Sequence, residues 1–130
     1  MKEPMPHKAT AKIAAILMIF HGLIEVSAPF TLSLMSSSLV SFGGLDRAEI
    51  KANIGAIVAL GILWGLVRFV AAWGTWSLNK WGLALGISMS LITMIASVSV
   101  IPAGVADTIL AAPALGLLLY AWFGSRKIEV

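Results

Sequence analysis

The sequence predicts an all-α protein in which four transmembrane helices form an up-down-up-down bundle, with residues 1–130 making a single integral membrane domain. The first observation is composition: 59% of the 130 residues are apolar and 12% are charged, whereas about 25% are charged in an ordinary globular domain. The second is a set of four apolar stretches, each close to the roughly 20 residues that cross a bilayer. They cover about residues 13–35, 52–76, 81–101 and 105–123. One long and two short connections favour antiparallel neighbours.

The first span follows a tail at residues 1–11, which we expect to be polar and poorly ordered. Basic residues, an apolar core and the tripeptide at 26–28 are also typical of a secretory signal peptide. However, Pro29 would follow the cleavage position directly, and two ionisable residues interrupt the apolar core. We therefore expect this segment to be retained as a membrane span.

The second helix is predicted to run without interruption over Arg47–Leu78. Asp46 can cap its amino terminus while Glu49, three residues later, reaches back, as in a capping box. A tight turn at residues 79–80 leads into the third span. Pro102 ends that span, and a short turn leads into the fourth.

Basic residues are concentrated on one side of the predicted bundle. That side holds Lys2, Lys8, Lys12, Lys80, Arg126 and Lys127. The opposite side holds Arg47 and Lys51. An aromatic belt lies near the basic side and consists of Trp73, Trp76, Trp81, Tyr120 and Trp122. By the positive-inside rule, we expect a protein integral to the cell (cytoplasmic) membrane with both termini cytoplasmic.

Each span carries a stripe of small or polar residues at helical spacing. Helices in lipid associate through close backbone approach and polar contacts, so we expect these stripes to face inward. The stripes are Ala14, His21, Glu25 and Ala28; Gly61, Gly65, Arg68, Ala72 and Thr75; Gly82, Gly86, Ser90, Thr93 and Ser97; and Asp107, Ala111, Ala114 and Ala121. The two Gly-x-x-x-Gly pairs, Gly61/Gly65 and Gly82/Gly86, are the predicted helix-packing positions.

Three ionisable residues are predicted to form a buried polar cluster. His21 and Glu25 lie one helical turn apart, at depths of about 12 and 18 Å from the cytoplasmic start of the first span, and Arg68 lies about 9–15 Å from the cytoplasmic end of the second helix. These depths predict that Arg68 pairs with Glu25, with His21 beside them. The pair can serve only to fix the register of two helices, or Arg68 can snorkel to the headgroups, or the cluster can be a proton or ligand site. The sequence leaves all three interpretations open.

Several chemistries are disfavoured. The chain has no cysteine, which excludes disulfides and thiolate metal sites within it. His21 and Glu25 could supply two metal ligands, but a closed site needs more, and we expect no metal and no cofactor. Basic residues lie at the ends of apolar runs without a clustered face, which disfavours nucleic acid. No catalytic set is evident, and we expect no enzymatic activity. Asp107 is interpreted as a first-turn acid at the outer interface, favoured by the helix dipole.

The segment Arg68–Gly82 carries an Arg-bearing helix that ends in Trp73-Gly74 and turns through Lys80 into a second Trp-Gly pair. It resembles a hinge of small, uncharacterised prokaryotic four-helix integral membrane proteins; the resemblance covers the central third of the chain and implies no activity. Size and helix count are also similar to those of the small multidrug resistance transporters. In that family a first-helix acid binds protons and cationic substrates, and Glu25 would match it.

Two functions remain as hypotheses. The first is a structural or accessory subunit of a larger membrane assembly, in contact with lipid and with other membrane subunits or copies of itself. The scarcity of chemically reactive groups favours it. The alternative is a small dimeric proton-coupled transporter or channel centred on Glu25.

Overall fold

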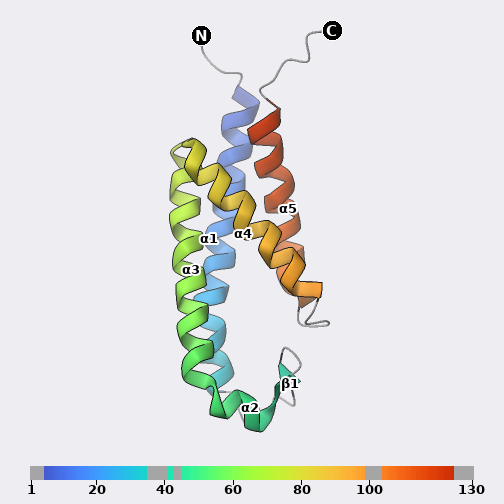
Figure 1. Cartoon of the computed structure of the whole chain (residues 1–130). Coiled ribbons are helices and arrows are strands. Elements are labelled where there is room, and N and C mark those ends of the chain that lie inside the picture. The colour runs from blue at the N-terminus through green and yellow to red at the C-terminus, as the bar shows by residue number, and fades with distance from the viewer. Residues whose placement is uncertain (1–4, 35–40, 43–44, 99–103, 125–130) are drawn as a thin grey trace.

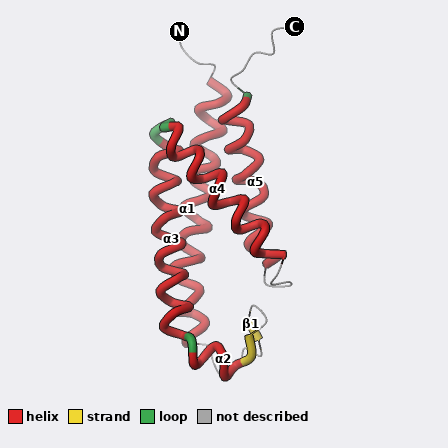
Figure 2. Tube along the Cα trace, viewed as in Figure 1, coloured by secondary structure: helices red, strands yellow, loops and turns green. Residues whose placement is uncertain are grey.

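The structure is a computed structural model that describes residues 5–34, 41–42, 45–98 and 104–124, and its architecture is an all-α four-helix bundle (Figures 1 and 2). The four long helices are α1 (Met5–Leu34), α3 (Ile54–Trp76), α4 (Lys80–Val98) and α5 (Gly104–Phe123). Consecutive long helices run in opposite directions, as predicted (Figure 1). The start of α1, the α3–α4 turn and the end of α5 therefore lie at one end of the bundle. All four helices are long and apolar enough to cross a membrane.

The connection between α1 and α3 has secondary structure of its own. Strands β1 (Ser41–Phe42) and β2 (Leu45–Asp46) pair in antiparallel fashion, and the short helix α2 (Arg47–Ala52) follows. These elements lie at the end of the bundle opposite the α3–α4 turn (Figure 1). The side chains of the proposed capping box lie outside the described residues.

Two sequence-based boundaries are wrong. Helix α1 begins at Met5, so most of the tail expected at 1–11 is helical. Pro6 does not prevent this, because proline is tolerated in the first turn, where its missing N–H has no intrahelical partner. The helix predicted to be continuous over Arg47–Leu78 is divided at Asn53, whose φ of −109° and ψ of 12° are not helical.

The other boundaries agree more closely. Helix α4 begins one residue earlier than predicted and is described to Val98, and the predicted stop at Pro102 lies outside the described residues. Helix α5 starts one residue before the predicted Val105 and ends at the predicted Phe123. Pro113 lies within α5, which continues through it as one helix.

The bundle core is built from small residues. Helix α1 packs against α3 and α5, and α4 packs against the same two helices from the other side. The buried apolar cluster is Ala14, Ala15, Met18, Ala71, Ala72, Leu83, Ala114 and Leu118. Small side chains allow close helix approach. Met18 fills the centre of the bundle. Gly86 of α4 leaves room for it, because a Cβ at that position would meet the Met18 sulfur at 3.0 Å and Leu118 of α5 at 3.1 Å.

The α3–α4 turn has a Schellman geometry. Asn79 N–H donates to the carbonyl of Gly74 at 2.9 Å, and Leu78 N–H donates to that of Thr75 at 3.0 Å. In this motif the residue directly after the C-cap adopts a left-handed backbone conformation, and that residue is usually glycine. Here Leu78 adopts it, with φ of 60°. The turn therefore contains local backbone strain.

Close backbone contact explains the two Trp-Gly pairs that flank this turn. A Cβ at Gly82 would collide with the backbone of Gly74, and a Cβ at Gly74 would meet the ring of Trp81 at 2.6 Å. The rings of Trp73 and Trp81 form an edge contact with centroids 6.1 Å apart. The glycines let α3 and α4 meet immediately after the turn, and the indoles pack beside them.

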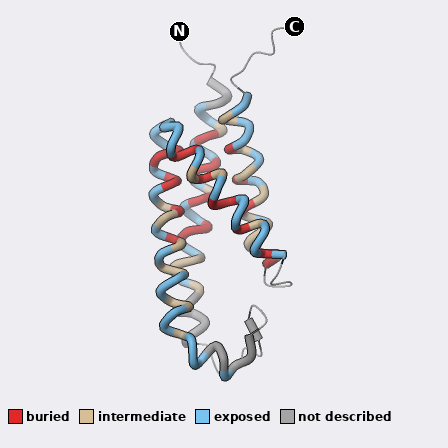
Figure 3. The backbone as a smooth tube through the Cα atoms, in the orientation of Figure 1, coloured by how far each residue is buried: buried red, intermediate tan, exposed pale blue. Residues whose placement is uncertain are grey.

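Burial is concentrated toward the α3–α4 turn (Figure 3). In α3, buried residues begin at Gly65, and none of residues 54–64 is buried. Away from the α3–α4 turn, the end of α4 and the start of α5 lie level with the middle of α1 and α3 (Figure 1). Among the described elements, no other long helix lies against the remaining part of the α1–α3 pair (Figure 1).

A candidate polar site within the bundle

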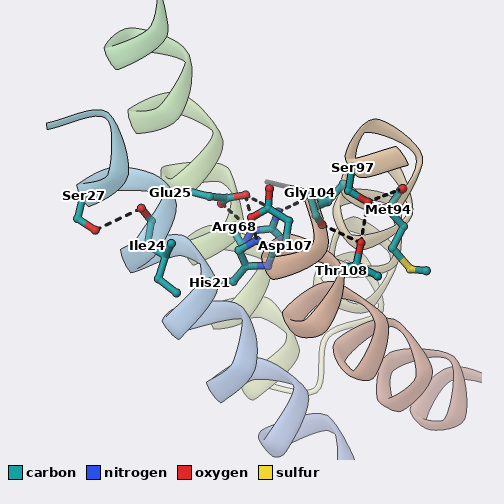
Figure 4. A network of polar contacts seen from close by, with 11 residues as sticks. His21, Ile24, Glu25, Ser27, Arg68, Met94, Ser97, Gly104, Asp107 and Thr108 are labelled. Carbon is teal, nitrogen blue, oxygen red and sulfur yellow. Dashed lines mark hydrogen bonds and ion pairs between the residues drawn. The ribbon is translucent and has the colours of Figure 1, made fainter. Parts of the chain in front are cut away.

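Arg68 of α3 and Glu25 of α1 form a bidentate pair (Figure 4). Arg68 Nε donates to Glu25 Oε2 and Nη2 donates to Oε1, both at 2.7 Å. The Arg68 side chain is fully buried and that of Glu25 is 14% exposed. Two parallel charge-assisted bonds of this length are among the strongest polar contacts in proteins. The two helices can approach closely here because Gly65, one turn before Arg68, has no side chain. A Cβ at Gly65 would meet the Gly22 carbonyl oxygen of α1 at 2.9 Å.

Thr93 adds a third helix to this pair. Arg68 Nη2 also donates to Thr93 Oγ1 of α4 at 2.7 Å, and the contact is buried. A threonine hydroxyl can accept this bond without adding a charge. Arg68 therefore links α1, α3 and α4.

His21 lies between two carboxylates. Its Nε2 is 3.3 Å from Asp107 Oδ1 of α5 and 3.7 Å from Glu25 Oε1, one turn along α1. His21 is 1% exposed, whereas the Asp107 side chain is 45% exposed. Because the same nitrogen faces two acceptors, these contacts favour a proton on Nε2. Asp107 lies in the first turn of α5, as predicted, but its contact with the middle of α1 was not anticipated.

A fourth contact joins α4 to α5. Ser97 Oγ and Thr108 Oγ1 share a hydrogen bond of 2.7 Å. Each hydroxyl also bonds a carbonyl of its own helix, Ser97 to Met94 at 2.8 Å and Thr108 to Gly104 at 2.9 Å. A Cβ at Gly104 would collide with the Ser97 backbone, so only a glycine permits this approach of the α5 start to α4.

These contacts close a circuit around the bundle, which we call the polar ring. Glu25–Arg68 joins α1 to α3, Arg68–Thr93 joins α3 to α4, Ser97–Thr108 joins α4 to α5, and Asp107–His21 joins α5 to α1. Every pair of neighbouring long helices therefore shares a polar contact at one level of the bundle (Figure 4).

A cleft of about 210 Å³ adjoins the polar ring. Its polar lining comes from Glu25, Asp107, Thr93 and Ser97. The rest of the lining is the indole of Trp64 together with two small or apolar residues of α4, Ile92 and Ala96.

Three buried polar atoms have no partner among the described residues. They are Arg68 Nη1, Thr75 Oγ1 and Ser90 Oγ. Buried polar groups normally have a partner, protein or water. Arg68 Nη1 belongs to the guanidinium that bonds Glu25 and Thr93, two residues that line the cleft.

Metal binding does not fit this arrangement. Within the described part of the chain, no three His, Asp or Glu side chains are placed to hold a metal ion. Although His21, Glu25 and Asp107 lie near one another, both oxygens of Glu25 already accept bonds from Arg68.

The structure brings together the three residues of the predicted cluster, His21, Glu25 and Arg68. Asp107 and Thr93 lie on the predicted inward stripes, but helical spacing alone does not connect them to the cluster. Of the four predicted packing glycines, Gly65, Gly82 and Gly86 are buried and Gly61 is half-buried. Gly22 is not among the predicted packing positions, although it provides the α1 side of the contact with Gly65.

Comparison with protein-family models, with curated proteins and with solved structures gives no match.

Proposed function

We propose that the protein is integral to the cytoplasmic membrane, with both termini in the cytoplasm. Support comes from four helices of sufficient length and apolarity and from large apolar side chains on their outer faces, such as Ile95 at 67% exposure. The basic residues Lys8, Lys12 and Lys80 lie at the end of the bundle that holds the α3–α4 turn. Lys12 Nζ lies 5.0 Å above the Trp76 ring. Such a basic and aromatic end is typical of the cytoplasmic interface.

Within that membrane, we propose that the protein is a structural or accessory subunit of a larger assembly, without a catalytic role. The polar ring is the observation that carries this proposal. A charged residue inside a membrane protein requires a partner, and here Arg68 and Glu25 partner each other within one chain. This charged pair therefore holds α1, α3 and α4 in register, and apolar faces remain for neighbours.

The outer half of α3 is the face that supports a subunit role. Leu60 is 65% exposed and Leu63 is 57% exposed, in a stretch where none of residues 54–64 is buried. Helices α4 and α5 end level with the middle of α3 (Figure 1), where Trp64 shares the cleft with them, and they do not extend along the part of α3 that contains Leu60. A neighbouring helix can therefore pack here without displacing a contact of the bundle.

The alternative, a dimeric proton-coupled transporter centred on Glu25, fits the geometry less well. Both Glu25 oxygens accept short bonds from Arg68, so this carboxylate is already engaged by a partner within its own chain.

Site-specific photo-crosslinking tests the subunit proposal. A photoreactive residue is introduced at Leu63, with Ile109 of α5, 66% exposed, as the matched control. In native membranes we expect Leu63 to give one crosslinked product with a different protein, which also co-purifies stoichiometrically in mild detergent. A product that contains two copies of this chain, with no other protein, would contradict the subunit role and favour the dimeric alternative.

A further inference from the structure

The end of the bundle that holds the α3–α4 turn carries positive charge without acidic partners among the described residues. Lys8 and Lys12 lie on the first part of α1 and Lys80 begins α4, and all three are exposed. The acidic residues of the described part of the chain lie elsewhere. Glu25 and Asp107 belong to the polar ring, and the others lie in β2 and α2 at the opposite end. This end is therefore a basic surface that an anion can complement.

Lys12 is held at the junction of two helices. Its Nζ lies 5.0 Å above the ring of Trp76, the last residue of α3. An indole attracts a cation through its π face but carries no net charge, so the ammonium group can still bind an anion. Lys8 lies one helical turn earlier on the same face of α1. Two ammonium groups on one helix face can therefore reach the same anion.

The exposed face of α1 changes from basic to apolar away from this end. Lys12 is followed at one-turn intervals by Ile16, 41% exposed, and Phe20, 58% exposed. Phe20 lies about 12 Å from Lys12 along the helix. A phospholipid has the same arrangement, with a charged phosphate at one end and hydrocarbon beyond it. A free phosphate ion would use only the charges, so this face fits a lipid better.

The net charge of the headgroup decides the class of lipid. In phosphatidylcholine and phosphatidylethanolamine, an ammonium group of the same molecule compensates the phosphate. Phosphatidylglycerol has no such group, so its negative charge is available to the lysines. Each lysine near an anionic lipid surface raises affinity by about fivefold, and two lysines therefore favour an anionic over a zwitterionic lipid by at least about tenfold.

We propose that Lys8, Lys12 and Trp76 form a lysine–indole surface that binds the headgroup of an anionic phospholipid. The phosphate accepts hydrogen bonds from the two ammonium groups beside the Trp76 ring, and an acyl chain lies along the apolar continuation of the same α1 face. Lys80 adds attraction without direct contact. This proposal rests on the proposed membrane location and does not depend on the subunit role.

Native mass spectrometry of the purified full-length protein in dodecyl maltoside, an uncharged detergent, tests the lipid preference. The probes are dioleoylphosphatidylglycerol and dioleoylphosphatidylcholine, which have the same acyl chains. We expect the first phosphatidylglycerol molecule to bind at least about tenfold more tightly than phosphatidylcholine. Equal affinity for the two lipids would overturn the proposal. Displacement of phosphatidylglycerol by an equal concentration of glycerol 3-phosphate would also overturn it, because the surface would then bind free phosphate compounds.

Lysine variants locate the site. Lys8→Gln and Lys12→Gln are each expected to weaken phosphatidylglycerol binding by about fivefold and to leave phosphatidylcholine binding unchanged. Lys51→Gln is the matched control, because this exposed lysine lies on α2 at the opposite end of the bundle. Equal weakening in all three variants would show that net charge alone governs binding and would overturn the site.

Trp76→Leu tests the position of Lys12 without changing any charge, and we expect it to weaken phosphatidylglycerol binding by roughly twofold to fivefold. Trp73→Leu is the control, at an indole that is 67% exposed and that no lysine contacts within the described part of the chain. Equal effects of the two indole variants would overturn the placement of the phosphate beside Trp76.

Phase separation in Triton X-114 distinguishes failure of this proposal from failure of the membrane location on which it rests. The wild-type protein is expected in the detergent phase. Protein in the aqueous phase would overturn both the membrane location and the lipid surface. Detergent-phase protein without a preference for phosphatidylglycerol would overturn the lipid surface alone.

Discussion

Arg68 and Glu25 are joined by two parallel hydrogen bonds of 2.7 Å, and a third bond of the same length joins Arg68 to a helix that does not contain Glu25. The guanidinium is thus the point where α1, α3 and α4 meet. Its planar set of donors suits this role, because a lysine ammonium cannot match a carboxylate at two positions and reach a hydroxyl with the same geometry.

Removal of only one partner of the Arg68–Glu25 pair is expected to destabilise the protein strongly. Arg68→Ala leaves a carboxylate without its partner and should lower the free energy of unfolding by about 3–5 kcal/mol, whereas removal of both charges in Glu25→Gln with Arg68→Met should cost less than either single change. Reversible unfolding in mixed micelles, followed by circular dichroism, measures these differences. Ser88→Ala is the control, since this exposed hydroxyl bonds only its own helix. Additive losses in the double variant would contradict direct coupling.

Substitution of glycine by alanine should destabilise the protein at some positions and stabilise it at others. Gly65→Ala and Gly82→Ala place a Cβ against backbone of a neighbouring helix and are expected to cost roughly 1–3 kcal/mol, as overpacking does. Gly55→Ala and Gly116→Ala meet nothing within 4 Å and should raise helix stability by about 0.5–1 kcal/mol. Thermal unfolding of the four variants in one detergent tests the ranking. Similar effects in both groups would show that the close helix contacts do not decide stability.

The strained turn predicts a stabilising substitution. Leu78→Gly removes the penalty of a left-handed conformation, about 1–2 kcal/mol for a residue with a Cβ, and loses part of that gain to the greater freedom of the unfolded chain. We expect a net increase in the unfolding midpoint, measured by the same thermal assay. Leu78→Val is the control, because a β-branched residue fits this conformation poorly, and its midpoint should fall.

The proposed orientation can be tested on a chain without native cysteines. Ser77→Cys lies in the exposed α3–α4 turn and Ala48→Cys lies on α2, at the opposite end of the bundle. A membrane-impermeant maleimide added to intact cells should label Ala48→Cys and should label Ser77→Cys only after permeabilisation. The reverse pattern would place the termini outside.

Helix number and the inward stripes could be predicted because both follow from local residue patterns. All five stripe residues of α4, Gly82, Gly86, Ser90, Thr93 and Ser97, are buried. The break at Asn53 has a weak signal in the sequence, since asparagine is favoured at helix N-caps and the apolar run begins directly after it, but no proline interrupts the helical pattern there.

The contact between Asp107 and His21 could not be predicted. Counting residues gives depth along each helix separately, and it placed Asp107 at an outer interface. In the structure the start of α5 lies level with the middle of α1. That relation depends on how far each pair of helices is shifted along the other, which close contacts such as Gly104 on Ser97 determine.

The polar ring also has an order of completion, set by the direction of synthesis. The Glu25–Arg68 contact becomes available once the second long helix is made, and Thr93 joins with the third. Asp107 and Thr108 are both on α5, so two of the four interhelix contacts form only when the last helix packs. A nascent chain that ends before Gly104 therefore has a linked α1, α3 and α4 but an open circuit. Arrival of α5 closes both remaining contacts together, so its packing completes assembly of the whole bundle.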